Sequence, residues 1–455
     1  MNKKSLVTRR KFIQTTAIVA IAAPFILESC ARSNSINGVL NHACIGIGGM
    51  GLGDLKQFIK HPNVNILAIC DVDSERLKTA SELVPEARIY SDWRELLKKE
   101  ANTIDSINVS VPDHSHFSIA YQAIEMGINV YCQKPMCHDV AEVRVLTEAA
   151  IKGGVTTQLG TQHAASENDR RAVQLIKEGA IGKIKHVYLC SNRSGIEKYR
   201  LEGPRPEQPY EAPSYLDWDL WIGTSQTRSF APGIYHKMKW RTWQDFGTGW
   251  SGDIGCHIFD AVWKGLDLKA PKSVTAEVQK SWQDSEDRRN DTWPQSNHIT
   301  WEFPGNDKIE ADNLTIEWFD GEFYPPQEIR DLFKGETYPE ESAILIGTEG
   351  ALLIEHGHGL QLLPQSKFKD HKVSNFEERN HYHHYVEACL GGENTESNFA
   401  QSGPMTEAIL LGTVAIRVPD QRLEWDAIHM KFPNFSDANK YLRRTYREGW
   451  SVAEF

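Results

Sequence analysis

Long hydrophobic runs are scarce in this 455-residue chain, and basic residues do not outnumber acidic ones. The formal net charge of −11 argues against a nucleic-acid partner and against a polybasic membrane patch. The 8 cysteines are scattered and lack zinc-finger spacing, so they predict neither a disulfide framework nor a metal site. No internal repeat is present. The length is enough for two or three domains.

The N-terminus has the features of an export signal. The pair Arg9-Arg10 precedes an apolar run over residues 16–27, which is too short to span a bilayer comfortably. The pattern resembles a bacterial twin-arginine signal, with an ordinary secretory signal as the alternative. Residues 27–30 resemble a lipoprotein cleavage box that would place a lipid anchor on Cys30. We expect residues 1–37 to be signal and tether, and the protein to be periplasmic or anchored in the cell envelope.

A glycine-rich turn follows the first apolar strand of the folded part. Residues 46–51 read Gly-Ile-Gly-Gly-Met-Gly and contain G-x-G-x-x-G as Gly46, Gly48 and Gly51. The first glycine permits the tight turn, the second admits a pyrophosphate, and the third allows close helix–strand packing. Asp71 ends the next strand, where an acid can bind a ribose 2′-hydroxyl. The pattern predicts a dinucleotide site, and the acid favours NAD over NADP.

The hydrophobic pattern divides the chain in two. Up to about residue 160, short apolar runs alternate with amphipathic helices, which predicts a parallel sheet covered on both faces. Beyond it, strand-like runs follow one another without helices between them, and several alternate apolar and polar residues. This indicates a largely antiparallel sheet with one covered face. We expect strands at 184–190, 274–278, 298–303, 309–318 and 351–354, and helices at 167–178, 378–390 and 404–418.

Three polar side chains stand where chemistry is expected. Lys134 follows a predicted parallel strand, at the sheet edge where ligands bind. Asp253 and His257 are spaced i and i+4, so a helix would place both on one face. A histidine beside a carboxylate suits a general base, but metal ligation, or a helix-capping Asp with a core histidine, would give the same spacing.

Aromatic residues are frequent before this helix, and the chain has 13 tryptophans. Aromatic faces with cations between them suit sugar rings, which makes Tyr235, Trp240 and Arg241 candidate substrate contacts, although core packing explains most tryptophans better. Two histidine clusters, at 356–358 and 381–384, lack the carboxylate or thiolate spacing of a metal centre. We therefore expect no metal.

Together these motifs resemble the Gfo/Idh/MocA family of glucose–fructose oxidoreductase, inositol dehydrogenase and relatives. The resemblance also rests on Val111-Pro112-Asp113-His114-Ser115-His116, Gln133-Lys134-Pro135, Gly182, Leu216–Gly223 and Gly347–Gly350. It implies an α/β protein with an NAD-binding Rossmann domain over residues 38–160. It also implies a C-terminal substrate domain over residues 161–455, an α/β domain with an open, mostly antiparallel sheet. The family's pairing of exposed sheets implies a homo-oligomer.

The resemblance also assigns roles to residues. It implies that Lys134, Asp253 and His257 line the substrate beside the nicotinamide. The usual glutamate before the lysine is Gln133 here, a change expected to lower the pKa of Lys134 and weaken its orientation. The expected cofactor contacts are Gly46, Gly48, Gly49, Met50, Gly51, Asp71, Pro112, His116, Gln133 and Lys134.

The predicted function is NAD-dependent oxidation of a CH–OH group of a sugar, glycoside or polyol. In this hypothesis His257 takes the hydroxyl proton, Asp253 orients it, and Lys134 stabilises the alkoxide. Export implies that NAD stays bound and is regenerated in place. Two alternatives stay open: an NAD-dependent glycoside hydrolase or lyase working through a transient keto sugar, and a non-catalytic sugar-binding protein on the same scaffold.

Overall fold

The N-terminal half of the folded chain is a doubly wound α/β domain. The computed structural model describes residues 38–192, 201–206, 208–333 and 338–453, all within one compact unit, Ala31–Phe455. The predicted signal, Cys30 included, lies outside the described residues. The first sheet has six parallel strands in the order β3-β2-β1-β4-β5-β6. They are β1 (Leu40–Ile45), β2 (Val64–Cys70), β3 (Arg88–Tyr90), β4 (Ser106–Val109), β5 (Asn129–Cys132) and β6 (Thr157–Leu159).

Helices connect these strands, and capping side chains fix where two of them begin. Asp73 accepts from the backbone N–H groups of Glu75 and Arg76 at the start of α3, and Asp139 accepts from that of Glu142 at the start of α6. The strand order reverses direction between β1 and β4, which is the topological switch point where such sheets bind ligands. The helices are α2 (Met50–Phe58), α3 (Ser74–Ser81), α4 (Trp93–Glu100), α5 (His116–Glu125) and α6 (Val140–Gly153).

The second half builds a mixed sheet of eight strands in the order β13-β12-β11-β7-β10-β9-β8-β14. Neighbours are antiparallel except β7 and β10, which run parallel. The expected, mostly antiparallel architecture is confirmed. The strands are β7 (Ile184–Ser191), β8 (Ser273–Val278), β9 (Asn297–Pro304), β10 (Asn313–Asp320), β11 (Glu341–Gly347), β12 (Ala351–Glu355), β13 (Leu360–Leu363) and β14 (Leu423–Glu424).

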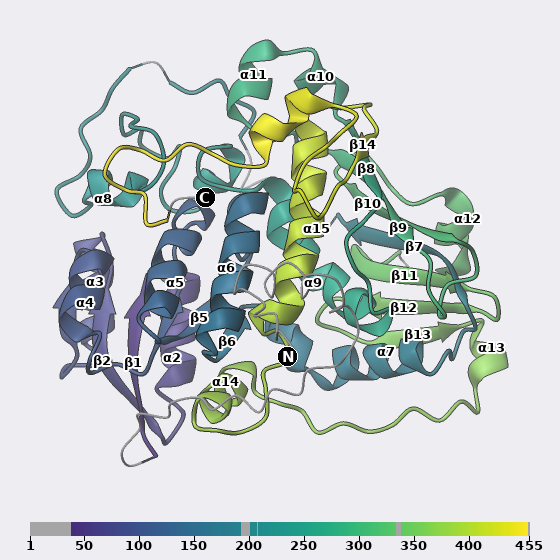
Figure 1. Ribbon diagram of the computed structural model, residues 1–455, viewed down its shortest axis with the longest axis horizontal. Coiled ribbons are helices and arrows are strands. Elements are labelled where there is room, and N and C mark those ends of the chain that lie inside the picture. Colours follow the sequence, from purple (N-terminus) through teal and green to yellow (C-terminus); the bar gives the residue numbers. More distant parts are fainter. Residues whose placement is uncertain (1–37, 193–200, 207, 334–337, 454–455) are drawn as a thin grey trace, which may run out of the picture. The chain divides into compact units, whose positions relative to one another are not determined.

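One long helix joins the two halves. Helix α15 (Phe399–Arg417) packs against α6 of the first half and against α9 (Gly249–Gly265), β8 and β9 of the second. Figure 1 shows it standing between the parallel sheet and the mixed sheet. Helix α7 (Glu167–Lys177) packs on α9, and α14 (His381–Cys389) packs on α2. The remaining short helices are α8 (Trp218–Ile222), α10 (Lys280–Gln283), α11 (Glu286–Asp291), α12 (Gln327–Arg330) and α13 (Gln365–Phe368).

Several predicted boundaries are wrong. The expected helix at 404–418 begins earlier, at Phe399, because Asn398 caps it by accepting from the Gln401 N–H, and Pro404 lies inside the helix. The expected strand at 309–318 begins only at Asn313, and β11 and β13 were not predicted.

Cysteine behaves as a core residue: the seven described cysteines are buried and free. Among the described residues no helix combines the length and apolar character needed to cross a membrane.

The C-terminal tail returns to the first domain. The Ala141 N–H donates to the Leu442 carbonyl at 3.0 Å. Arg444 donates to the buried Glu142 carboxylate at 2.7 Å, and the Tyr446 hydroxyl donates to the same oxygen. The last residues of the chain therefore supply the countercharge for a carboxylate at the start of α6.

Candidate active site

A cavity of about 370 Å³ lies at the carboxyl edge of the parallel sheet. It runs along the ends of β1, β2, β4 and β5, which is where an open α/β sheet binds its ligand. Two groups of residues line it. From the sheet edge these include Gly46, Gly48, Gly49, Met50, Asp71, Arg76, Trp93, Pro112, Asp113, Gln133 and Lys134, and from a later segment Leu220, Trp221, His236, Lys237, Met238, Trp240 and Arg241.

The glycine turn is held by contacts that exclude a side chain. A Cβ on Gly51 would lie 2.0 Å from the Gly46 carbonyl oxygen, and one on Gly46 would lie 2.4 Å from that of Ser110. Gly49 precedes α2 with φ of 54° and makes no side-chain cap, and the Gly51 N–H donates to the Gly48 carbonyl at 3.0 Å, so an anion at this helix end would meet the remaining N–H groups of the turn. Gly48, Gly49 and Met50 line the cavity, whereas Gly51 acts by packing.

Asp71 lines the cavity at the end of β2. Its carboxylate oxygens accept from the Ile47 N–H at 2.8 Å and the Asp73 N–H at 2.9 Å. Burial raises the pKa of Asp71 to about 6, against the opposing effect of those two N–H groups. Arg76, from α3, also lines the cavity and lies against Gly48, where a Cβ would be 3.2 Å from its Nε.

Lys134 lines the cavity and forms an ion pair with Asp253, which is buried and does not belong to the lining. The Lys134 ammonium donates to the Asp253 backbone oxygen and to its Oδ1, both at 2.9 Å, and the Arg241 Nε donates to Oδ2 at 3.2 Å. Burial disfavours the charge on Asp253, but Lys134 and Arg241 outweigh it and lower its pKa to about 2. Asp253 is therefore a fixed anion between two cations.

His257 lies one turn after Asp253 on α9, as the spacing predicts. Its ring contacts that of His356 with centroids 4.8 Å apart, and His356 in turn contacts His163 at 4.7 Å. The Asp253 carboxylate accepts from the cations Lys134 and Arg241, so the orientation of His257 by Asp253 stays a prediction. Among the described residues no group of three or more His, Cys, Asp or Glu side chains could hold a metal ion.

Gln133 has a partner that was not predicted. Its side-chain amide donates to both oxygens of Asp54, a carboxylate of α2 that is fully buried. Asp54 also accepts from the hydroxyls of Ser110 at 2.6 Å and Tyr382 at 2.8 Å. The expected effect of the missing glutamate on Lys134 stays a prediction: the Gln133 side chain faces Asp54, and Lys134 pairs with Asp253. The spacing of Asp54 on α2 gave no signal of this contact.

Pro112 lines the cavity, but His116 does not belong to the lining. The His116 ring nitrogens lie 2.7 Å from the Pro135 carbonyl and 2.8 Å from the Val111 carbonyl, and the neutral ring, whose pKa is lowered by burial, donates to one of them. It thus lies between the loops that follow β4 and β5. Its expected cofactor contact is corrected to a positioning role, because the ring is buried against these carbonyls and does not line the cavity.

The three residues expected to contact a sugar, Tyr235, Trp240 and Arg241, do not all reach the cavity. Trp240 and Arg241 line the cavity, with the Arg241 guanidinium 4.2 Å from the Trp240 ring centre. Tyr235 is 3% exposed and packs against Trp218, Trp243 and Phe246, so its expected sugar contact is corrected to core packing.

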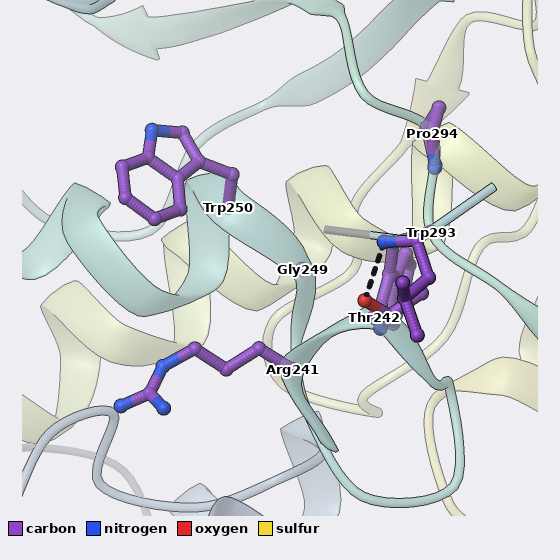
Figure 2. A pocket seen from close by; sticks show the side chains of 7 residues that line it. Arg241, Thr242, Gly249, Trp250, Trp293 and Pro294 are labelled. Atoms are coloured by element: carbon purple, nitrogen blue, oxygen red, sulfur yellow. Dashed lines mark hydrogen bonds between the residues drawn. The ribbon is translucent and has the colours of Figure 1, made fainter. Parts of the chain in front are cut away.

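Arg241 also borders a second cavity of about 20 Å³, large enough for about one water. In Figure 2 the Arg241 side chain points away from Thr242 and Trp293, and Trp250 lies on another side of the cavity.

The segment covering the cavity, residues 208–248, is called the roof segment. Three contacts join it to the strand end at residues 71–74. The Ser74 N–H donates to the Tyr215 carbonyl at 2.8 Å, the Asp217 N–H donates to the Val72 carbonyl at 2.9 Å, and the His236 ring bonds Asp73 at 3.2 Å. Its own core comprises Leu216, Trp221, Ile222, Ala231, Tyr235, Trp240, Trp243 and Phe246.

These features fit a dinucleotide. The glycine turn, the open first turn of α2 and Asp71 match a pyrophosphate and a ribose, and a buried oxygen of Asp113 at the other end of the cavity has no hydrogen-bond partner among the described residues. A polar ligand group would satisfy that oxygen.

Curated relatives match about a third to a half of the chain. D-apiose dehydrogenase of Paraburkholderia graminis is 28% identical over 140 residues, which is 31% of this chain and 37% of the relative. A glycosyl hydrolase family 109 protein of Stenotrophomonas maltophilia is 23% identical over 248 residues, covering 51% of this chain and 50% of the relative. The chain thus matches about half or less of these relatives' length.

Solved structures share the fold over most of the chain. GenD2 from gentamicin A biosynthesis, in complex with NAD, has a TM-score of 0.56 at 19% identity and covers 86% of this chain and 97% of its own. An inositol dehydrogenase homologue from Azotobacter vinelandii, with NADH and myo-inositol, has a TM-score of 0.55 at 15% identity and covers 86% and 98%.

Two family models describe the chain in succession. Residues 40–161 match an oxidoreductase family with an NAD-binding Rossmann fold, and residues 166–325 match its C-terminal α/β domain. Together they cover more than half of the chain. The protein belongs to the Gfo/Idh/MocA family of NAD-binding oxidoreductases.

Proposed function

We propose that this protein oxidises a CH–OH group of a sugar, glycoside or polyol and keeps its NAD bound between turnovers. The observation that carries the proposal is that Lys134 and Arg241 line the same cavity as the glycine turn and are both held by the buried Asp253. The family membership and the dehydrogenase relatives support the reaction class.

The chain's own residues divide the work. The glycine turn and Asp71 hold the adenosine and pyrophosphate, and bound NAD supplies a hydride acceptor. The Lys134 ammonium, fixed by Asp253, faces the reacting oxygen and stabilises its negative charge. Trp240 and Arg241 hold the sugar through an apolar face and a hydrogen-bonding cation. His257 remains our proposed acceptor of the hydroxyl proton.

The roof segment supports retention of the cofactor. It contributes Trp221, His236, Met238, Trp240 and Arg241 to the cavity lining, so a bound dinucleotide would be covered on that side. Together with the predicted export signal at residues 1–37, this favours a redox-neutral cycle in which the cofactor is reduced and reoxidised in place. We propose that the protein works outside the cytoplasm and forms a homo-oligomer.

One alternative has an observation of its own. The match to a glycosyl hydrolase family 109 protein covers about half of the chain and favours a hydrolase or lyase that passes through a keto sugar. The oxidation step would be the same, but the ketone would acidify the neighbouring C–H and allow the glycosidic bond to break before the hydride is returned.

A single panel of assays separates these functions. Purified protein is mixed with sugars, polyols and glycosides while the near-ultraviolet band of reduced cofactor and the release of free sugar are followed. Reduced cofactor supports the dehydrogenase, and free sugar without net reduction supports the glycosidase. Binding without either, unchanged by Lys134→Ala, supports a sugar-binding protein. Lys60→Ala, on the surface, is the matched control, and failure to bind any dinucleotide contradicts both enzymatic functions.

Export is tested separately by fractionating cells that make the wild type or the double variant R9K/R10K. The variant is expected to stay in the cytoplasm. Equal export of both proteins would contradict a twin-arginine route. Light scattering of the purified protein tests the oligomer.

A further inference from the structure

Asp113 is a buried carboxyl group with one unused oxygen. It follows β4, is 1% exposed and lines the cavity. The Thr248 N–H and hydroxyl donate to its Oδ2 at 3.1 and 3.0 Å. Its Oδ1 has no hydrogen-bond partner among the residues that the structure describes. A buried oxygen without a partner is costly unless a ligand or a proton satisfies it.

The charges that face Asp113 come from three other parts of the chain. Lys134 follows β5, Arg241 belongs to the roof segment, and Asp253 lies on α9. The Cys132 thiol of β5 is also close, and burial together with Asp113 raises its pKa. Lys134 and Arg241 both donate hydrogen bonds to the Asp253 carboxylate. These two cations therefore compensate the charge of Asp253 directly, whereas they act on Asp113 only from a distance.

The position of Asp113 follows from the strand order. The dinucleotide pyrophosphate belongs at the start of α2, and Asp71 at the end of β2 marks the adenosine side. The strand order places β4 on the opposite side of β1 from β2. The nicotinamide half therefore extends toward Asp113 and Lys134. The oxidised nicotinamide ring carries a positive charge and the reduced ring does not.

We propose that Asp113 takes up a proton at Oδ1 when the cofactor is reduced and releases it when the cofactor is oxidised. This inference rests on the proposed function for its purpose. The hydride of the substrate would go to the nicotinamide, and the hydroxyl proton, first accepted by His257, would end on Asp113 Oδ1. A later carbonyl compound takes both back. A retained cofactor thus stores the hydride and the proton side by side.

The electrostatics of the site agree with this role. Burial and the neighbouring Asp253 raise the pKa of Asp113 to about 7, against the opposing effects of Arg241 and Lys134. Both protonation states are then accessible near neutral pH, and a single positive charge nearby is enough to select between them. A group that is always charged, such as Asp253, could not change state in this way.

The proposal predicts a pH-dependent preference between the two cofactor forms. As pH rises, Asp113 ionises and favours NAD⁺ over NADH. The ratio of the two dissociation constants should therefore shift by up to about tenfold per pH unit near neutral pH, as a one-proton linkage requires. Titrations of both forms over a pH series measure it without substrate or turnover.

Two variants make the test specific. Asp113→Asn should bind both forms with a ratio that no longer changes with pH. Asp71→Asn, on the adenosine side, should weaken both forms together and keep the slope. Proton uptake on NADH binding, measured by calorimetry of the wild type in two buffers of different ionisation heat, needs no variant.

The outcomes are distinct. A flat ratio in the wild type, or a slope that survives in Asp113→Asn, would overturn the role of Asp113 while leaving the proposed function standing. The expected slope without turnover of any sugar would leave the role of Asp113 standing and contradict the proposed function. Failure to bind either dinucleotide would overturn both.

Discussion

The side-chain amide of Gln133 donates to both carboxylate oxygens of Asp54, at 3.0 and 2.9 Å. The resemblance to relatives implies a glutamate at position 133. In this chain the carboxyl group at that point belongs to α2 instead, and burial raises the pKa of Asp54 against the hydrogen bonds from Ser110, Gln133 and Tyr382. A glutamate at 133 would place two carboxylates in contact at a site with almost no solvent exposure, so the glutamine is required by Asp54.

Gln133→Glu should therefore destabilise the protein by at least about 2 kcal/mol at neutral pH, because a buried hydrogen bond is replaced by a repulsion between like charges. Adding Asp54→Asn should restore much of the loss, since the new amide can donate to the new carboxylate. Urea unfolding of the single and double variants measures both effects. Additive losses in the double variant would contradict the pairing.

Two glycines of the same turn and helix should respond in opposite ways to alanine. Gly51→Ala places a Cβ 2.0 Å from the Gly46 carbonyl oxygen, so it should distort the turn, weaken NAD binding and destabilise the protein. Gly53→Ala meets only the Met50 sulfur at 3.9 Å and should stabilise α2 by up to about 1 kcal/mol. Thermal unfolding and NADH titration of the pair measure this. If the two variants had the same stability and the same NADH affinity, close packing at Gly51 would not be what limits the turn.

The affinity for NAD should fall as pH drops through about 6. Burial raises the pKa of Asp71 to about 6, and its ionised form is the better acceptor of ribose hydroxyls. Below that pH the carboxyl takes up a proton and loses acceptor capacity, so both NAD⁺ and NADH should weaken. Asp71→Asn should bind roughly tenfold or more weakly at neutral pH and lose this dependence. Fluorescence titration of NADH measures it, and an unchanged acid-side affinity in the wild type would count against it.

The tail should contribute strongly to stability. Arg444→Met leaves the buried Glu142 carboxylate without its cation and should cost about 3–5 kcal/mol in the free energy of unfolding. Arg443→Met, one residue earlier, is the neighbouring comparison and should cost less, because Arg443 is exposed to solvent. Chemical denaturation of both variants is the measurement. A small effect for Arg444→Met would mean that water replaces the guanidinium.

The nucleotide half of the fold follows from the sequence because its strands are short and mostly buried and alternate regularly with helices. The glycine turn and Asp71 carry their geometry in local spacing. The second half is harder: β13 is half-exposed and has no alternating pattern, and Pro404 conceals the true start of α15 at Phe399. The local pattern predicts where a helix is interrupted more readily than where tertiary contacts let it continue.

The candidate site was likewise predicted from the sequence only in part. Lys134, Asp253 and Arg241 were predicted from position and motif, and the structure brings them together. The pairing of Asp54 with Gln133 joins residues 79 positions apart and leaves no trace in local spacing. Tyr235 could not be distinguished from Trp240 by sequence, because burial in the roof segment depends on how that segment folds back on itself.

The return of the C-terminal tail to α6 sets the order in which the molecule can mature. The nucleotide-binding half leaves the ribosome first, yet Glu142 gains its partner only when Arg444 and Tyr446 have been synthesised. That half therefore lacks the partners of this buried carboxylate until the tail has been made and has folded back onto α6.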